Sequence, residues 1–527
     1  MNIFLMKKQL VALLLIGFTV LSFASCQAKT KTPKSANILK AKDFKHYVDY
    51  FNRMEDEPIV QAIPNAESWD WMQANIPLFS CPQDNFEEMW YFRWWSLRKG
   101  IRETPLGFVI NEFLVERSYA DKYNMISCAL GHHIYETRWL HDSKYLDQYL
   151  HVWFRGNEGA PMKRLRSFSS WTAYAVYNRY LADGNKEYML DLLPDLEKEY
   201  RDWEGDHRLP DGMYWQGDVQ DGMEESVSGG RRIKNARPTI NSYMYGNALA
   251  LSKMFSLSGE TAKAALYAAK ADTIKKMVQD NLWHPERKFF ETRWVNGQLA
   301  QAREAIGYIP WYFNLPDLGK NYEEAWLQVK DPEGFLAPYG LTTAERRHPE
   351  FRTRGVGQCE WDGAVWPFAS SQTMTAMANV LNNYEQNYVD KATYYELMNL
   401  YVESQYHRGR PYIGEYLDEV TGYWLKGDQL RSRYYNHSTF ADLIITGLMG
   451  LRPGEDNILV VNPLIPQEQW DWFCLDNLMY HGKNIAVVWD KSGKKFNKGQ
   501  GLLIFCNGKK VAQKPTIEKI TVDISPY

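Results

Sequence analysis

The chain has 527 residues, and 61 lysines and arginines against 64 aspartates and glutamates give it a formal net charge of -3 at neutral pH. So mild a charge offers no basic surface for nucleic acid, which excludes partners held mainly through phosphates. Its 20 tryptophans and 34 tyrosines are unusually many. Amphipathic rings of this kind either build a large core or stack on the faces of polar ligands such as sugars.

The first thirty residues have the pattern of an export signal. Two lysines precede the apolar run 11–20, which is too short to span a bilayer comfortably. Two small residues then precede Cys26, as in a bacterial lipoprotein box. We expect a signal peptide over 1–25, a lipid on Cys26 and a polar tether over 26–44, with plain secretion as the alternative. The mature protein would then lie in the periplasm or at the outer membrane, attached only through its lipid.

From about residue 45 to 450, apolar residues recur at three- and four-residue spacing, which predicts helices. Short loops bounded by Gly, Pro, Asn and Asp separate them. The predicted helices cover residues 85–101, 144–156, 169–184, 187–205, 237–254, 260–283, 364–384, 392–409 and 438–450. Because no strand pattern intervenes, we expect a single all-α domain over 45–450. Its longer loops, where function tends to lie, cover 206–238, 284–300, 331–362 and 407–436.

After residue 450 the pattern changes to short β-type runs, such as "IAVVWDK" and "GLLIFCNGKKV". Residues 451–527 are therefore predicted to form a small β-rich appendage. Beyond Cys26 the cysteines are odd in number and widely separated, so they predict no disulfide framework. They are Cys81, Cys128, Cys359, Cys474 and Cys506.

The segment "DVQDGMEESVSGG" (218–230) gathers four acids in eight positions and then turns into glycines. A calcium loop starting at Asp218 would need a carboxylate at its twelfth position, where Gly229 stands, so that interpretation fails. A solvated turn and a set of catalytic carboxylates both stay open. Arg237 and Asn241 follow at the start of a predicted helix, and Arg237 could neutralise neighbouring acids or hold a substrate hydroxyl.

Two further acidic segments lie in loops beside predicted helices. "GEYLDEVTGYW" (414–424) carries Glu415, and "CEWDGAVWPFASS" (359–371) carries two acids between tryptophans. Turn-forming acids and core tryptophans are the ordinary interpretations of such residues. Hydroxyl recognition and ring stacking are the functional ones, with Trp361 and Trp366 as the stacking platforms.

Two other patterns are weaker. His132 and Glu136 stand four residues apart on a predicted helix, but a metal site needs a third ligand that the sequence does not offer. The acids of "SCPQDNFEEMW" (80–90) lead straight into a helix, where first-turn acids are expected anyway. Phosphate-binding and dinucleotide-binding motifs do not occur in the sequence. We expect no metal and no cofactor.

The three segments 221–251, 359–371 and 414–424, taken in this order, resemble the helical-toroid glycoside hydrolases around family 63 and mannosylglycerate hydrolase. The resemblance is greatest to the lipoprotein members from Bacteroidetes, and it covers roughly residues 80–450. It implies an (α/α)6 toroid and hydrolysis of a glycosidic bond with inversion, in which one carboxylic acid protonates the leaving oxygen and a second carboxylate activates water.

Carried onto this sequence, the resemblance implies Glu224 as the general acid and Glu415 as the general base. Relatives often have Asp at the acid position, so Asp221 and Glu225 remain alternative donors. Apolar neighbours would keep the acid protonated, and the polar segment 431–438 would hold the base ionised. The side chains expected to contact substrate are Asp221, Arg237, Asn241, Trp311, Glu360, Trp361, Asp362, Trp366 and His437.

The expected function is therefore an inverting glycoside hydrolase that acts on an oligosaccharide. An α-L-rhamnosidase or uronide-processing enzyme on the same scaffold is the alternative within enzymes. A carbohydrate-binding lipoprotein that has lost catalysis is the alternative outside them. The sugar, the linkage and the oligomeric state are not encoded in these motifs.

Overall fold

The computed structural model describes residues 37–527, so Cys26 and the expected signal peptide lie outside the described residues. The expected tether ends earlier than residue 44. The backbone amides of Ile38 and Leu39 donate to the Asp476 carboxylate over 2.6 and 2.8 Å, and Phe44 is buried. Apolar side chains at 38 and 39 pack on the C-terminal sheet, which is why this stretch does not behave as a linker.

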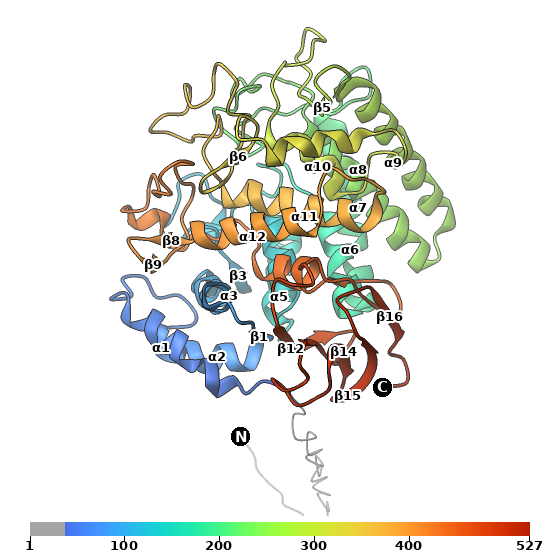
Figure 1. The fold of residues 1–527 in the computed structure, drawn as a ribbon. Helices are drawn as coiled ribbons and strands as arrows, with labels where there is room; N and C mark the ends of the chain where they lie inside the picture. The colour runs from blue at the N-terminus through green and yellow to red at the C-terminus, as the bar shows by residue number, and fades with distance from the viewer. Residues whose placement is uncertain (1–36) are drawn as a thin grey trace, which may run out of the picture. The chain divides into compact units, whose positions relative to one another are not determined.

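Apart from three short 3-10 helices (Lys122–Asn124, Ala305–Tyr308 and Leu430–Ser432), twelve helical segments follow one another between residues 84 and 448 (Figure 1). Those at even positions in this order contact each other in series. The even-numbered segments are α4 (Leu130–Thr137), α6 (Thr172–Asp183), α8 (Pro238–Ser258), α10 (Ile309–Tyr312), α11 (Pro367–Asn383) and a π-helix (Leu443–Leu448). The others are α3 (Asp84–Lys99), α5 (Lys144–Arg155), α7 (Lys186–His207), α9 (Thr261–Leu282), a 3-10 helix (Tyr322–Lys330) and α12 (Lys391–Ser404). Two short helices, α1 (Lys45–Arg53) and α2 (Ser68–Asn75), precede them.

Glu136 closes the series by joining α4 to the π-helix. Its buried carboxylate accepts the backbone N–H groups of Phe440, Ala441 and Asp442 over 2.9–3.2 Å. The Arg138 guanidinium also lies 2.6 Å from the Asp442 carboxylate. Glu136 thus satisfies amides at a helix start that would otherwise be unpaired.

Replacing Glu136 by alanine should therefore lower the free energy of unfolding by about 3 kcal/mol or more, because buried N–H groups lose a charged acceptor. Urea unfolding followed by circular dichroism measures this. Glu385→Ala, at a position just beyond α11, is the control, and an equal loss in both variants would contradict the role given to Glu136.

The sequence supplies the ends of several helices. Pro367 occupies the first turn of α11, where its missing N–H costs nothing. Gly184 and Gly259 follow α6 and α8 in the left-handed conformation, which favours glycine. Asp390 begins α12 by accepting from the Thr393 amide over 2.8 Å.

The prediction of an all-α domain over 45–450 is wrong in one respect, since short strands lie among the helices. They form the antiparallel pairs β2–β3 (Ile101–Thr104, Gly107–Ile110), β4–β5 (Trp283–His284, Phe289–Phe290), β6–β7 (Leu336–Ala337, Gly340–Leu341) and β8–β9 (Tyr406–His407, Arg410–Pro411). With two residues in most of these strands, a period-two pattern cannot be seen in the sequence.

The C-terminal region is β-rich, and a strand from the helical region completes its sheet. The five-stranded sheet has the order β1-β12-β13-β14-β15 and is antiparallel throughout. Its strands are β1 (Leu78–Ser80), β12 (Trp472–Tyr480), β13 (Lys483–Asp490), β14 (Gly501–Cys506) and β15 (Lys509–Lys514). A second sheet contains β10 (Leu451–Arg452), β11 (Ile458–Val461) and β16 (Ile520–Asp523).

Alternation along these strands buries both faces of the larger sheet. Leu475, Val487 and Ile504 join the main core, whereas their neighbours Val488 and Leu503 form a second apolar cluster. All five cysteines in the described part are free thiols. Within residues 37–527, no helix is both long and apolar enough to cross a membrane.

Candidate active site

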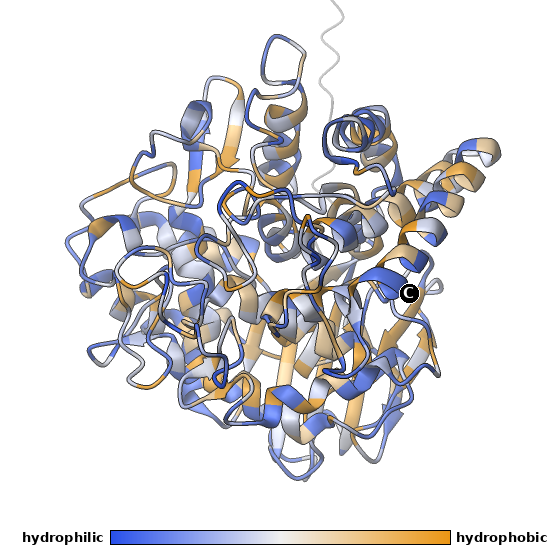
Figure 2. Cartoon of the chain, turned by 90° about the horizontal axis from the view of Figure 1, so that it is seen from above, coloured by the Kyte–Doolittle hydropathy of each residue, from blue (hydrophilic) through white to orange (hydrophobic). Residues whose placement is uncertain are grey.

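Loops that precede α4, α6, α8, α11 and the π-helix surround a cavity of about 550 Å³. Five separate segments of the chain contribute side chains to the lining of this cavity. Figure 2 shows that the loops of the molecule are largely hydrophilic, while hydrophobic residues concentrate in the helices and strands. It is lined by Glu112, Arg117, Tyr119, Ile126, Cys128, Phe168, Val219, Gly222, Glu224, Cys359, Trp361, Trp366, Phe368, Glu415, Arg431, Tyr435 and His437. Carboxyls, guanidiniums and aromatic rings therefore share one space.

The four acids of segment 218–230 have different surroundings. Asp218 accepts the backbone amides of Val219 and Gly230 and so closes the loop on itself. Glu225 points away and pairs with Arg231. Glu224 alone lines the cavity, and it forms no ion pair with any residue in the described part of the chain.

Asp221 is a structural residue and not a second acid in the cavity. Its side chain is fully buried, with the Arg237 Nε 2.6 Å away and the Ser169 hydroxyl donating over 2.7 Å. The Thr239 hydroxyl donates to it as well. Neither Asp221 nor Arg237 lines the cavity, so the structure places both beneath the loop that carries Glu224.

Gly222 decides where that loop lies. It adopts φ +72°, and a Cβ at this position would collide with the Cys128 sulfur. Only glycine allows so close an approach, and Glu224 follows two residues later.

Burial raises the pKa of Glu224 to about 7, and the negative charge of Glu415 acts in the same direction. A carboxyl with this pKa is largely protonated below neutral pH and about half protonated at it, and the protonated form is the state that a proton donor needs. The preceding residue, Met223, is apolar and itself buried, in line with the apolar neighbours expected for the acid.

Glu415 has the opposite environment. The Arg431 Nη2 lies 3.0 Å from its Oε2 and the Lys426 Nζ lies 3.8 Å from the same oxygen. The contact between Arg431 and Glu415 is an ion pair, but its donor–acceptor angle does not make it a hydrogen bond. Two cations therefore lie within 4 Å of this carboxyl.

The backbone around Glu415 is fixed from two sides. Its amide donates to Ser432 Oγ over 3.2 Å, and its carbonyl oxygen lies 3.1 Å from His437 Nε2. Two backbone hydrogen bonds of 3.0 Å between Leu417 and Val365 tie this loop to the segment that carries Trp366. Glu415, the candidate base, and the segment with Trp366 are therefore held in a fixed position relative to each other.

Trp361 and Trp366 stack with their ring centroids 4.3 Å apart, and Tyr416 continues the stack at 4.5 Å. Both tryptophans line the cavity although they are almost entirely buried. His437 also lines the cavity. Burial keeps its pKa well below the usual range, so it is neutral, and its Nδ1 has no partner in the described part.

The other residues expected to contact substrate lie outside the cavity. The Asn241 side chain accepts from the Tyr214 backbone amide and donates to the carbonyl oxygens of Tyr214 and Arg237. These bonds anchor the backbone around Tyr214 to the start of α8. Trp311 is fully buried against Phe290 and Trp326. These placements correct the expectation, because helix-start residues of the right chemical type serve the scaffold here.

Glu360 and Asp362 have the same structural character. Glu360 pairs with Arg352 over 2.5 Å and accepts from the Gly357 amide. Asp362 accepts the amides of Arg354 and Gly355 over 2.6 and 3.0 Å. Both acids shape the loop that positions Trp361 and are not cavity residues.

Sequence reasoning missed one carboxyl. Glu112 follows β3, is buried, and accepts from the Tyr435 hydroxyl over 2.7 Å while its other oxygen has no partner in the described part. Burial raises its pKa to about 8, with the charges of Glu415 and Glu224 adding to the effect. A single acid in an ordinary segment, "VINEFLVER", carries no motif that could have revealed it.

His132 and Glu136 do not form a metal site. His132 packs between Trp171 and Phe368, and Glu136 is occupied by the backbone amides described above. Among residues 37–527, no three His, Cys, Asp or Glu side chains are grouped closely enough to hold a metal ion.

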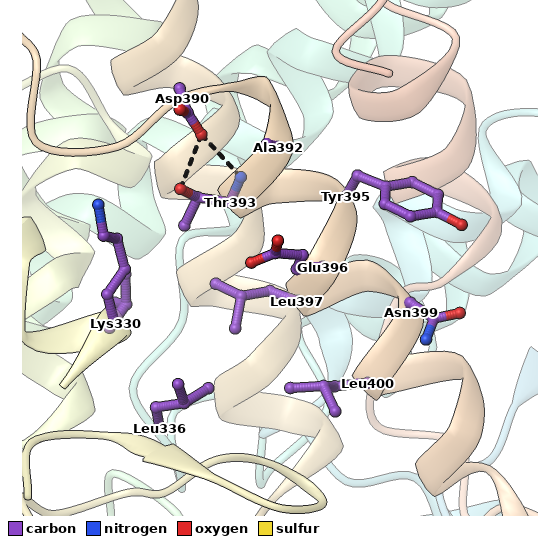
Figure 3. Close-up of a pocket in the computed structure, with 11 residues that line it drawn as sticks. Lys330, Leu336, Asp390, Ala392, Thr393, Tyr395, Glu396, Leu397, Asn399 and Leu400 are labelled. Atoms are coloured by element: carbon purple, nitrogen blue, oxygen red, sulfur yellow. Dashed lines mark hydrogen bonds between the residues drawn. The ribbon is translucent and has the colours of Figure 1, made fainter. Parts of the chain in front are cut away.

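A second hollow, of about 640 Å³, lies along α12 (Figure 3). Two of its polar residues have partners: the Asp390 carboxylate accepts from the Thr393 amide at the start of α12, and Asn399 accepts from Gln83 over 2.7 Å. Leucines 336, 397 and 400 make up much of the rest. Of the two acids that line it, Asp390 is held by Thr393, which leaves Glu396 as a single carboxyl, so this hollow is not a candidate active site.

The sequence profile of the mannosylglycerate hydrolase MGH1-like glycoside hydrolase domain matches residues 122–438. The chain belongs to this family of glycoside hydrolases. Residues 451–513 match the C-terminal domain of glycosyl hydrolase family 65. The family match spans most of the segments that line the cavity, which makes this cavity the candidate active site.

A solved structure named "Sialidase" is 64% identical, with a TM-score of 0.92, over 93% of this chain. This chain covers only 45% of that protein. The family 63 mannosylglycerate hydrolase from Thermus thermophilus in complex with glucose has a TM-score of 0.52 at 16% identity, over 68% of this chain and 99% of that one. The latter likeness concerns the fold alone.

Two further relatives match parts of the chain. The family 78 rhamnosidase of Bacillus sp. GL1 has a TM-score of 0.53 at 12% identity, over 79% of this chain and 40% of that one. An uncharacterized protein of Borreliella burgdorferi is 23% identical over 197 residues, 37% of this chain and 40% of that protein. The chain thus spans less than half the length of both the sialidase-named structure and this curated relative.

Proposed function

We propose that this glycosidase hydrolyses an oligosaccharide with inversion, using Glu224 as general acid and Glu415 as general base. One observation carries the proposal: two carboxyls line one cavity in opposite electrostatic settings. The pKa of Glu224 is raised to about 7 by burial, while Glu415 pairs with Arg431. Environments that separate two carboxyls in this way are how a site assigns acid and base.

In the proposed step, the Glu224 carboxyl gives its proton to the glycosidic oxygen as the bond from that oxygen to the anomeric carbon breaks. The Glu415 carboxylate takes a proton from a water molecule whose oxygen attacks the anomeric carbon from the opposite face. Glu224 ends ionised and Glu415 ends protonated, and transfer of one proton through solvent restores both. Of the alternative donors, Asp221 and Glu225 are each committed to an arginine.

We assign the twelve alternating helical segments to an (α/α)6 toroid, with residues 45–450 as the catalytic domain and 451–527 as the β-rich appendage. The contact series α4–α6–α8–α10–α11–π-helix, with Glu136 joining its two ends, supports this assignment. The lining loops precede α4, α6, α8, α11 and the π-helix. In a toroid these helix starts share one face, which accounts for carboxyls nearly two hundred residues apart lining one cavity.

Substrate contacts are proposed for Trp361, Trp366 and His437, which line the cavity beside the two carboxyls. Aromatic edges and faces bind the apolar sides of sugar rings, and the neutral His437 can accept or donate to a hydroxyl. We also propose that the protein is exported and is anchored through a lipid on Cys26, in the periplasm or at the outer membrane.

Sialidase activity is a second candidate, favoured by the 64% identity to the sialidase-named structure. Because this chain covers 45% of that protein, the activity named there could reside in its other part. Incubation with neutral and with sialylated oligosaccharides, followed by chromatography of the released sugars, tests both functions. Release of a neutral sugar alone supports the first, release of sialic acid supports the second, and no release contradicts both.

Glu112 is expected to act as a neutral hydrogen-bond donor in this site. With a pKa of about 8 it is protonated at neutral pH, and glutamine reproduces both its shape and its lack of charge. Glu112→Gln should therefore change kcat/KM by less than about threefold at pH 6, whereas Glu112→Ala should reduce it by about tenfold, since a neutral hydrogen bond to substrate is worth about 0.5–1.5 kcal/mol. Steady-state kinetics of the two variants measure this, and inactivity of the glutamine variant would make Glu112 a catalytic acid.

A further inference from the structure

Arg117 is a guanidinium in the active-site cavity with no acidic partner. It lies on the loop after β3, lines the cavity and forms no ion pair with any carboxylate in residues 37–527. The other arginine of the cavity, Arg431, is paired with Glu415. Even Glu116, the next residue along the chain, is paired elsewhere, with Arg102 over 2.6 Å.

The loop holds Arg117 in place through ring contacts and backbone hydrogen bonds and without an ion pair to any residue in 37–527. The guanidinium carbon lies 5.2 Å from the Phe113 ring centroid and 5.4 Å from that of Tyr119, and it also interacts with the Tyr119 hydroxyl. The Arg117 amide donates to Asn124 Oδ1 over 2.9 Å, and Asn124 Nδ2 donates to the Phe113 carbonyl over 2.8 Å. A pre-positioned planar cation of this kind binds carboxylate-like groups with little loss of entropy.

One N–H donor of this guanidinium lacks a hydrogen-bond acceptor within residues 37–527. The Nε of Arg117 is buried and has no hydrogen-bond partner in the described part of the molecule. An unsatisfied buried donor costs free energy in the empty site, and a bound acceptor removes that cost. Tyr119, whose hydroxyl this guanidinium contacts, also lines the cavity and is 39% exposed.

The charges of the cavity do not cancel. Glu415 is offset by Arg431, and burial raises the pKa values of Glu224 and Glu112 to about 7 and about 8, which leaves both largely neutral below pH 7. Arg117 therefore contributes a positive charge that nothing lining the cavity balances. A cationic, partly desolvated site selects ligands of the opposite charge.

We propose that Arg117 binds an acidic group, a carboxylate or a sulfate ester, carried by the substrate sugar at the opening of the cavity. That this sugar is a substrate rests on the proposed glycosidase function, but the binding of an acidic sugar does not. The two oxygens of a carboxylate, or two of a sulfate, would accept from Nε and one Nη in the fork geometry that arginine provides.

Titration calorimetry on the wild-type chain tests this with four probes: D-glucuronate and N-acetylneuraminate for carboxylates, glucose-6-sulfate for sulfates, and glucose as the neutral reference. Arg117→Gln removes the charge and the fork, and Arg117→Lys keeps the charge alone. Arg102→Gln is the matched control, since it removes a partly exposed arginine beside the same loop that is not a cavity residue.

We expect at least one acidic probe to bind the wild-type and Arg102→Gln proteins about tenfold or more tightly than glucose. That preference should vanish in Arg117→Gln and be partly kept in Arg117→Lys, while glucose affinity stays unchanged. The probe preferred identifies the group as carboxylate or sulfate. Equal binding of acidic and neutral probes, or a preference that survives in Arg117→Gln, would overturn the proposal.

The binding of acidic probes can be judged independently of the proposed glycosidase function, because calorimetry measures binding without any turnover of substrate. Acid-selective binding without hydrolysis of any glycan would keep the Arg117 site and reject the catalytic assignment. Hydrolysis confined to neutral glycans, with Arg117→Gln fully active on them and no acidic probe preferred, would do the reverse.

Discussion

Replacing Glu224 by glutamine is expected to reduce kcat on an oligosaccharide on the order of a thousandfold, because glutamine cannot donate a proton to the departing oxygen. The buried position and the absence of an ion pair mean that nothing else in the fold depends on its charge. Thermal unfolding should therefore change little. Steady-state kinetics and circular dichroism on the same preparations measure both effects.

Glu225→Gln is the matched control, since it makes the same chemical change one residue away on a side chain that pairs with Arg231. It should keep nearly full activity. A second comparison uses a nitrophenyl glycoside of the same sugar, whose leaving group needs little protonation, and Glu224→Gln should recover much of its rate on it. A variant equally slow on both substrates would contradict a proton-donor role for Glu224.

The pH profile gives a further check on the same residue. The acid must be protonated, so activity should be present below a pH of about 7 and lost as pH rises through the pKa of Glu224. This alkaline limb should be absent from the residual activity of Glu224→Gln.

Replacing Glu415 by glutamine is expected to lower kcat on the order of a thousandfold to ten-thousandfold, because an amide cannot take a proton from the attacking water. The loss should be as large on the nitrophenyl glycoside as on the oligosaccharide, since water attack is needed for both. This contrast separates the base from the acid without any structural measurement.

Asp418→Asn is the control for this loop. Asp418 accepts from the Thr421 amide and hydroxyl over 2.9 Å in a turn outside the cavity, so its variant should retain most activity. If Glu415→Gln kept more than about a tenth of wild-type kcat, the water-activating role would have to move to another group. Glu112 would be the next carboxyl to test.

The helical region could be predicted from the sequence because amphipathic periodicity over ten or more residues leaves a strong pattern. Helix α9, predicted over 260–283, spans Thr261–Leu282. The π-helix Leu443–Leu448 lies within the helix predicted over 438–450, but its wider winding leaves no mark in composition. Two-residue strands, such as β4 and β5, are set by tertiary contacts and leave no pattern either.

The candidate site shows a similar division. Motifs located the loops of Glu224 and Glu415, but residue type alone could not separate cavity residues from scaffold. Asp221 and Glu360 have the chemistry of ligand-binding residues, and their ion pairs with Arg237 and Arg352 depend on how distant segments meet. Glu112 and Arg117 were missed for the converse reason, since an isolated charge acquires meaning only from the cavity around it.

The most direct test of the catalytic account is proton NMR of the first sugar released from an oligosaccharide by the wild-type enzyme, recorded before the anomers equilibrate. Attack of water activated by Glu415, with Glu224 as proton donor, predicts that the first product has the configuration opposite to that of the bond cleaved. A product that retains the substrate configuration would contradict the account, because it requires a covalent intermediate on a carboxylate to which we assign a different role.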